Sequence, residues 1–581
     1  MQQVASSPTI DRSISGKERA VEFFTIAAVL AVSAGVYALL FNRSNVLSHS
    51  IGYNLYASDR VLEGAVPYRD FHTLYPPATF YLNAALFRWL GVSLQSALIG
   101  VLIFKVLTVG VIYMSGRQVM PRIWAVAAAI SGLLWLRPNG PFKSVPMHYG
   151  GLFLALAMLL LLKSESRGRL ISIFLAGASL GFVALFKHNI GAYALAGSFV
   201  LLLFEDRFEV RRNLIYGEGR NSALRRLSDK LKLVEPFALL SGCAAAVIPA
   251  VAYMEMKGAL LPMIRTLLFG PGEFLLSRLA IPLSPVAPAA LVASLAASAY
   301  FAHRFRGRPA LALLISIVLI LAIFVFVLRG NQSDVNQLIF YLPMFVLACG
   351  LLVAVFGKSV TGAERRTLLI ILIFSAAALM ELFPRFAREQ SIAAMPFVML
   401  FLFYLLHVLR PAIRVLAGGP LRYRLAMAVL PMTFLMIEGR LFFNTYFDSN
   451  LRFKAGTRPN IERGGGVYFP AATAALIDDA VTYIQQRVPA GGNAFAQSDA
   501  GTSLLFLSNR KNVSNAQFWI GVGVTQEERA ATLERIDKSQ TKLVITSDEV
   551  LAAEKYKPMR DYIERNFRPS TRFEDVLMLE R

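Results

Sequence analysis

"FFTIAAVLAVSAGVYALLF" occupies residues 23–41 and is apolar along nearly its whole length. As a helix, a segment of this length is about 30 Å long, which matches the hydrocarbon core of a bilayer. Three basic residues, Arg12, Lys17 and Arg19, precede it. The run is longer than the apolar region of a cleaved signal peptide, so we expect an uncleaved first membrane helix.

Similar apolar segments recur along the 581 residues, of which 56% are hydrophobic and 17% are charged. A soluble domain does not bury that much apolar surface, so the composition predicts a polytopic membrane protein. We expect a mainly α fold, a transmembrane bundle of about thirteen helices. The expected spans are 22–41, 95–115, 123–137, 148–162, 170–186, 190–204, 236–254, 284–302, 309–328, 338–356, 367–383, 392–409 and 425–443.

The formal charge of +22 is distributed unevenly. After residue 439 there are 19 Lys and Arg against 17 Asp and Glu, whereas the preceding part holds 40 and 20. Because the basic blocks lie between apolar spans, they indicate orientation in the membrane rather than a nucleic-acid partner. With the N-terminus cytoplasmic, inside connections hold 26 Lys and Arg, and outside connections hold 13 when Arg137, the last residue of its span, is included. This bias favours a cytoplasmic N-terminus, and the odd number of expected spans then places the tail on the extracytoplasmic side.

The tail, residues 470–581, reads as a small α/β domain. "ATAALIDDAVTYIQQRV" has apolar residues at helical spacing, and "PAGG" ends the helix. We expect further helices at "TQEERAATLERIDKSQ" and "MRDYIERNF", and strands at "KLVITS" and "EDVLMLE". The predicted organisation is a cytoplasmic tail 1–21, a membrane domain 22–443 with first outer loop 42–94, a linker 444–469, and this domain.

The first outer loop contains "GAVPYRDFHTLYPPATFYL", residues 64–82. Its prolines fix the backbone and remove hydrogen-bond donors, so they stiffen the connection. Upstream, "SIGYNLYASDRVLEG" alternates apolar and charged residues at helical spacing, which predicts an amphipathic helix lying on the membrane. A rigid loop at this depth suits a site that holds a polar group at the level of lipid headgroups.

The stretch "YASDRVLEGAVPYRDFHTLYPPATFYLNAALFRWLG", residues 56–91, resembles the GT-C superfamily of polytopic membrane glycosyltransferases. That superfamily includes protein mannosyltransferases and lipid A aminoarabinose transferases. Further similarity lies in "GFVALFKHNIGAYALAG", residues 181–197, and in the small C-terminal domain. The resemblance implies an enzyme of the bacterial inner membrane that transfers a sugar from a polyprenyl-phosphate donor to an extracytoplasmic acceptor, a lipid, glycan or protein, with inversion at the anomeric carbon.

The chain departs from the superfamily at the position of its expected acids. Such transferases carry an acidic residue just after the first helix, where this chain has Ser50 and Ile51 in "HSIG". In a late outer loop, "FPRFAREQS" has Ala387 and Gln390 where Asp and His are expected. Either another acid performs the catalytic role, or the chain has lost catalysis and serves in envelope glycan assembly.

A sugar transfer of this kind needs a carboxylate that takes a proton from the acceptor hydroxyl. Asp70 and Asp59 are the candidates. Asp70 matches a recurrent position of the superfamily and lies beside Arg69 and His72, which could tune its pKa. The alternative is that Asp70 pairs with Arg69 or caps a turn.

The leaving phosphate needs cations, for which arginine offers a planar fork. An alternative role for such residues is to anchor the protein by extending towards headgroups of membrane lipids. The candidate substrate-binding residues are Arg69, His72, Tyr75, Lys187, Arg385 and Arg329. The histidines of the outer face could bind phosphate or a divalent metal, but no ligand spacing supports a metal, and no other cofactor is indicated.

A lipid or glycan transporter is a second class of function for such a chain. It predicts internal repeats and several charged residues within spans. We find no obvious repeat, and mainly Lys105 lies within a span. The sequence therefore favours the transferase.

Overall fold

A computed structural model describes residues 16–40, 49–136, 145–164, 168–204, 222–269, 346–355, 360–382, 388–411, 456–516 and 526–581 except 553, with a few single positions between 343 and 439. Within these residues, five helices are long and apolar enough to cross a membrane. They are α1 (Gly16–Leu40), α4 (Leu94–Val119), α6 (Val145–Lys163), α7 (Arg169–Phe186) and α10 (Ser222–Met256). The expected multi-pass helix bundle is confirmed.

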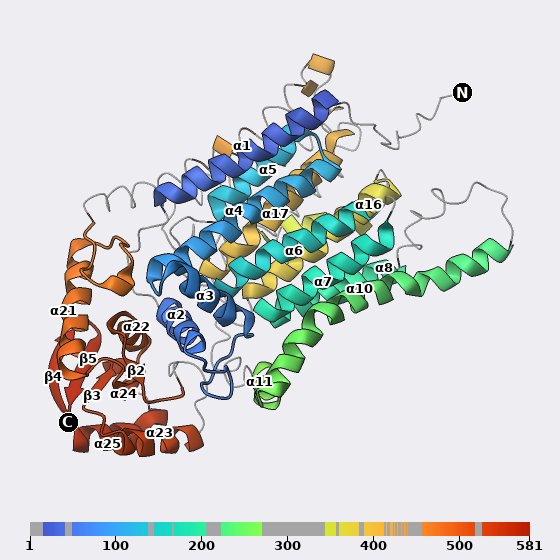
Figure 1. The fold of residues 1–581 in the computed structure, drawn as a ribbon. Coiled ribbons are helices and arrows are strands. Elements are labelled where there is room, and N and C mark those ends of the chain that lie inside the picture. The colour runs from blue at the N-terminus through green and yellow to red at the C-terminus, as the bar shows by residue number, and fades with distance from the viewer. Residues whose placement is uncertain are drawn as a thin grey trace, which may run out of the picture.

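Shorter apolar helices complete the described part of the bundle, and Figure 1 shows them running beside the longer ones. They are α5 (Arg122–Trp135), α8 (His188–Phe204), the part Ala393–Val408 of α17 (Arg388–Val408), and a further short segment at Val346–Val355. Helix α16 (Gly362–Leu379), which carries charged residues in its first turn, packs against α17 and α8. The expected spans 284–302 and 309–328 lie outside the described residues, as does most of 425–443.

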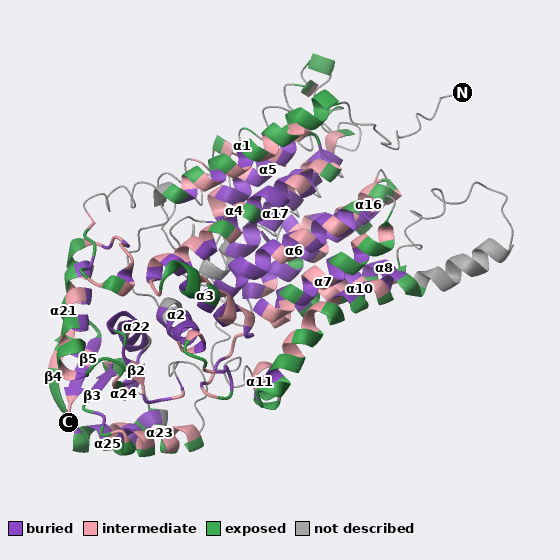
Figure 2. Cartoon of the chain, viewed as in Figure 1, coloured by how far each residue is buried: buried purple, intermediate pink, exposed green. Residues whose placement is uncertain are grey.

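Burial follows position in the bundle. In Figure 2 the side chains of α4, α6 and α17 are largely buried, whereas α1 and α10 show exposed faces. The exposed residues on α1 and α10 include large apolar ones such as Phe23, Phe24, Phe237 and Ile248. A helix face of this kind is compatible with lipid.

Helices α7 and α10 approach each other through glycines. A Cβ on Gly177 would lie 1.9 Å from the carbonyl oxygen of Leu239, and one on Gly242 would lie 1.9 Å from that of Phe174. Small residues of this kind let membrane helices pack backbone to backbone. Any larger side chain at either position would force the two helices apart.

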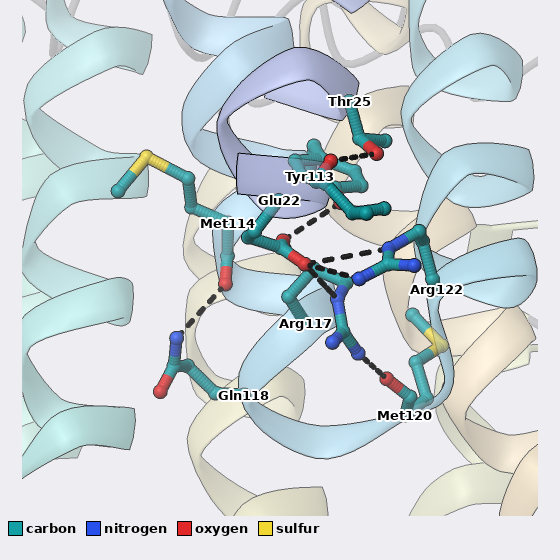
Figure 3. A network of polar contacts seen from close by, with 9 residues as sticks. Glu22, Thr25, Tyr113, Met114, Arg117, Gln118, Met120 and Arg122 are labelled. Atoms are coloured by element: carbon teal, nitrogen blue, oxygen red, sulfur yellow. Dashed lines mark hydrogen bonds and ion pairs between the residues drawn. The ribbon is translucent and has the colours of Figure 1, made fainter. Parts of the chain in front are cut away.

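One end of the bundle is held by a polar network around Glu22 of α1 (Figure 3). The hydroxyl of Tyr113 donates to its carboxylate at 2.7 Å, and Arg117 of α4 lies 3.1 Å from the carboxylate. Arg122 of α5 adds a contact of 3.2 Å. The network therefore links α1, α4 and α5 at the C-terminal end of α4, near Val119.

The tail forms the expected α/β domain. Its five-stranded sheet has the order β2-β1-β3-β5-β4, in which β1 pairs parallel with β2 and β3, and β5 pairs antiparallel with β3 and β4. The strands are β1 (Asn493–Ala496), β2 (Lys511–Asn512), β3 (Leu543–Thr546), β4 (Arg568–Phe573) and β5 (Val576–Glu580). The two further helices and the two strands that the sequence predicts after the first helix of the tail are all present. The helices of the domain include α21 (Ala471–Arg487), α22 (Asp499–Ser508), α23 (Gln526–Lys538) and α25 (Lys557–Asn566).

The helix predicted before the proline-rich loop is α2 (His49–Leu62), but it is not an exposed amphipathic helix. Its residues 52–59 are all buried, because α2 packs between α3 (Ala78–Leu90) and α22 of the tail domain. A Cβ on Gly52 would lie 1.9 Å from the hydroxyl oxygen of Ser503, so the two helices are in close contact. Protein therefore covers the face of α2 that the sequence pattern predicted to meet solvent.

The first loop and the tail domain share one hydrophobic core. Tyr56 of α2 and Phe87 of α3 are buried with Val481 and Leu504 of the tail. Figure 1 shows the tail domain beside α2 at one end of the bundle. Two parts with a common core lie on the same side of a membrane, so an even number of crossings separates residue 94 from the tail.

Candidate site at the first outer loop

The loop after α2 is fixed by hydrogen bonds within itself. The backbone N–H of Tyr68 donates to the carbonyl of Phe71 at 2.8 Å, and that of Asp70 donates to the carbonyl of Val66 at 2.9 Å. The hydroxyl of Tyr68 donates to the carbonyl of Tyr75 at 2.6 Å. Tyr68 itself has φ of +67°, a conformation that costs free energy in a non-glycine residue and here closes the turn.

Asp70 forms a two-point ion pair with Arg69. Arg69 Nε and Nη2 lie 2.8 Å from the two carboxylate oxygens, and the N–H of Val66 donates to Oδ2 at 2.7 Å. The hydrogen bonds from Arg69 lower the pKa of Asp70, although partial burial opposes them. Arg69 also donates to the carbonyl of Lys257 at 3.2 Å. Asp70 is therefore an ionised carboxylate that both pairs with Arg69 and caps a turn.

Asp59 lies at the interface with the tail domain. It is 8% exposed, and its Oδ2 accepts from Nη1 of Arg463 at 2.5 Å. Burial raises the pKa of Asp59, while the charge and hydrogen bond of Arg463 act in the opposite direction. The structure brings neither Arg69 nor Asp70 to this pair.

Lys187 occupies the single extended position between α7 and α8. Its Nζ lies 3.1 Å from Oε2 of Glu381. Glu381 belongs to the short helix Met380–Leu382, and it is only 2% exposed. The same Nζ lies 5.2 Å from the centre of the Tyr75 ring. The structure thus brings together two of the predicted substrate-binding residues, Tyr75 and Lys187, around a buried carboxylate.

Sequence reasoning missed Glu381. The available signal was an acid at the end of the apolar run "LLIILIFSAAALMELF", where a charge is costly unless a partner is present. Its partner lies 194 positions away, so no local pattern connects the two residues.

Aromatic side chains hold Tyr75 over this ion pair. The Tyr53 ring lies 6.1 Å from Tyr75 and 6.0 Å from Phe80, and Phe71 lies 5.9 Å from Phe80. The Tyr53–Tyr75 contact is tilted and the other two are edge-to-face, and such contacts add to the stability gained by burial. Tyr75 of the "YPP" stretch is therefore held in place by ring packing as well as by the hydrogen bonds of the loop.

His72 faces the tail domain rather than Lys187. Its backbone N–H donates to the carbonyl of Asn515 at 3.0 Å, and burial lowers the pKa of its imidazole. Two other predicted phosphate ligands, Arg329 and Arg385, lie outside the described residues. Within the part of the chain that the structure describes, no group of three or more His, Cys, Asp or Glu is arranged to hold a metal ion.

The described site thus offers two charged pairs near one rigid loop. Arg69 and Asp70 lie on its surface, whereas Lys187 and Glu381 lie buried under Tyr75. Chemically, each pair combines a cation that can bind an anionic group with a carboxylate that can accept a proton from a hydroxyl.

Comparison with protein-family models found no match, and comparison with curated proteins found no relative. Among solved structures, the chain is similar to an oligosaccharyltransferase from Archaeoglobus fulgidus in complex with Zn and sulfate. The TM-score is 0.47 and the identity 14%, covering 93% of this chain and 71% of that chain.

It is also similar to ArnT from Cupriavidus metallidurans bound to undecaprenyl phosphate, with TM-score 0.36 and 14% identity over 96% of this chain and 98% of that chain. A third similar structure is the archaeal oligosaccharyltransferase AglB from Archaeoglobus fulgidus in complex with an inhibitory peptide and a dolichol-phosphate. Its TM-score is 0.46 and its identity 14%, over 92% and 71% of the two chains.

Proposed function

We propose that the chain is a membrane glycosyltransferase that moves a sugar from a polyprenyl-phosphate donor to an extracytoplasmic acceptor. The observation that carries the proposal is the position of Tyr75 over the buried pair of Lys187 and Glu381. Tyr75 belongs to the loop that resembles GT-C transferases, and Lys187 belongs to the second similar stretch. Two segments that resemble the same superfamily thus meet at one charged site.

The charges of this site match the needs of the reaction. A phosphate that approaches the outer end of α7 would meet the ammonium of Lys187, and the donor lipid would lie along the apolar faces of the bundle. We propose Asp70 as the base rather than Asp59, because the Asp70 side chain is 32% exposed and that of Asp59 is 11% exposed. An acceptor hydroxyl can approach the partly exposed carboxylate of Asp70 from solvent.

The test is transfer of radiolabelled sugar from a polyprenyl-phosphate donor in membrane vesicles that contain the full chain. We expect Lys187→Met to raise the donor KM and Asp70→Asn to lower kcat, each by tenfold or more. Lys511→Met is the matched control, since Lys511 is a half-exposed lysine of the tail domain that pairs with Glu63. Full activity in Asp70→Asn would contradict its assignment as base.

A second candidate is a catalytically inactive GT-C relative that acts in envelope glycan assembly. Two observations favour it: Ser50 and Ile51 stand where the acids are expected, and the two candidate bases, Asp59 and Asp70, are both paired with arginines. This candidate predicts that wild type binds the donor but transfers no sugar. Binding of the donor without any turnover, in vesicles where a known transferase is active, would support it over the first proposal.

A further inference from the structure

A pocket of about 240 Å³ lies in the tail domain, where the linker meets α21 and the end of α22. It is separate from the Lys187 site, which lies at the junction of α7 and α8. The polar residues that line it are Asn460, Glu462, Arg463, Thr482, Gln485, Ser508, Asn509 and Arg510.

The accessible lining consists mainly of paired donors and acceptors. The amides of Asn460, Gln485 and Asn509 each offer both a donor and an acceptor, and the Glu462 carboxylate offers acceptors. Val481 and Leu507 lie beneath this polar surface and are buried, at 1% and 5% exposure. A small ring that carries several hydroxyls fits such a lining.

The two arginines of the lining are already engaged within the protein. Arg510 donates to the carbonyls of Val488 and Ser508, each at 2.6 Å, and Arg463 is paired with Asp59. Both guanidinium groups of the lining are therefore already hydrogen-bonded within the protein, and the charge of Glu462 repels an anion. Its volume lies below the roughly 300–1,000 Å³ typical of pockets for larger ligands. These properties favour one neutral sugar ring.

The pocket lies at the membrane side of the tail domain. A Cβ on Gly465 would lie 2.8 Å from Cβ of Gln95, at the start of α4, so the linker beside the pocket rests on the end of the bundle. Through Arg463, the lining is also joined to α2 of the first loop. We propose that this pocket is a subsite for one monosaccharide unit of the acceptor. Its sugar binding stands on the pocket itself, and only the identification with the acceptor rests on the proposed function.

The test uses the full chain in lipid nanodiscs and saturation-transfer-difference NMR with glucose, galactose, mannose and N-acetylglucosamine as probes. The test variant combines Gln485→Ala with Asn509→Gly. Asn509 has φ of +56°, which glycine adopts freely, so this change removes the amide without backbone strain. The control is Gln486→Ala, an exposed neighbour on α21 that does not line the pocket.

We expect at least one sugar to show saturation transfer in wild type and in Gln486→Ala, and to bind about tenfold more weakly to the double variant. The subsite is overturned if none of the four sugars shows saturation transfer in wild type, or if the double variant binds the sugar with the same affinity as wild type. Binding without enzymatic transfer leaves the subsite standing and removes the proposed function. Enzymatic transfer without binding removes only the subsite.

Discussion

Arg463, in the linker to the tail domain, donates a hydrogen bond to Asp59 of the first-loop helix α2 across 404 positions of sequence. Both side chains are largely buried, at 16% and 11% exposure. Removing one partner of such a pair leaves the other charge buried without compensation, at a cost of about 3–5 kcal/mol. The pair therefore joins the loop to the tail.

Arg463→Met should accordingly lower the stability with which the tail domain docks on α2. We expect a clear fall of the midpoint in thermal unfolding followed by tail-domain fluorescence. Arg463→Met combined with Asp59→Leu should recover most of that loss, because the two apolar side chains leave no charge unpaired. If the double variant were as unstable as the single one, the ion pair would not be the cause.

Gly52→Ala tests the contact between α2 and α22. Its new Cβ would lie 2.6 Å from the Cα of Ser503, so the helices must separate. Overpacking of this kind costs about 1–3 kcal/mol. Gly35→Ala on α1, where nothing lies within 4 Å, is the control and should be neutral or slightly stabilising. Equal thermal stability of the two variants would contradict the described packing.

Lys187 and Glu381 allow stability to be separated from function. Glu381→Leu alone should destabilise the protein, because it leaves the buried ammonium of Lys187 unpaired. Adding Lys187→Met should restore thermal stability, but we expect sugar transfer to remain lost. Recovery of transfer in the stable double variant would show that the pair acts only in folding.

Arg69 controls the protonation of Asp70. The pKa of Asp70 lies below its ordinary value of 3.8, chiefly because of the hydrogen bonds from Arg69. A lowered folded-state pKa means that this stabilisation is present above the ordinary value and is lost as the pH falls through the folded value. Between pH 5 and 8 it should therefore be constant.

In Arg69→Gln the acidic limb of the pH–rate profile should move to higher pH, because the main cause of the lowered pKa is gone. Arg60→Gln, which changes a charge that acts on Asp70 only at longer range, should leave that limb nearly in place. An unmoved limb in Arg69→Gln would show that Asp70 is not the group that titrates.

Labelling of single cysteines tests the topology. With Cys243 and Cys349 replaced, cysteines at Arg69 and Asn509 should react with an impermeant maleimide from the same side of sealed vesicles. A cysteine at Gln118 should react only from the other side, because α4 has 26 residues and spans about 39 Å. Reaction of positions 118 and 509 from one side would overturn the arrangement.

The sequence alone determined the membrane bundle and most elements of the tail. Long apolar runs have few stable states other than membrane helices, because hydrocarbon offers no hydrogen-bond partners to backbone N–H and C=O groups and a helix pairs them internally. Local patterning also predicted the separation of the helices that flank Lys187 and the strand "KLVITS", now β3. Apolar spacing and turn residues act between near neighbours, so they can be read directly from the chain.

The tertiary structure decided how the charges of the first loop are used. Asp59 forms an ion pair with Arg463, and Lys187 forms one with Glu381. Helix α2 is buried against α22 instead of lying exposed. A polar residue on a helix face looks the same in sequence whether water or another domain meets it. Which of the two meets it depends on packing between segments hundreds of positions apart, because burial makes a charge stable only beside a partner of opposite sign.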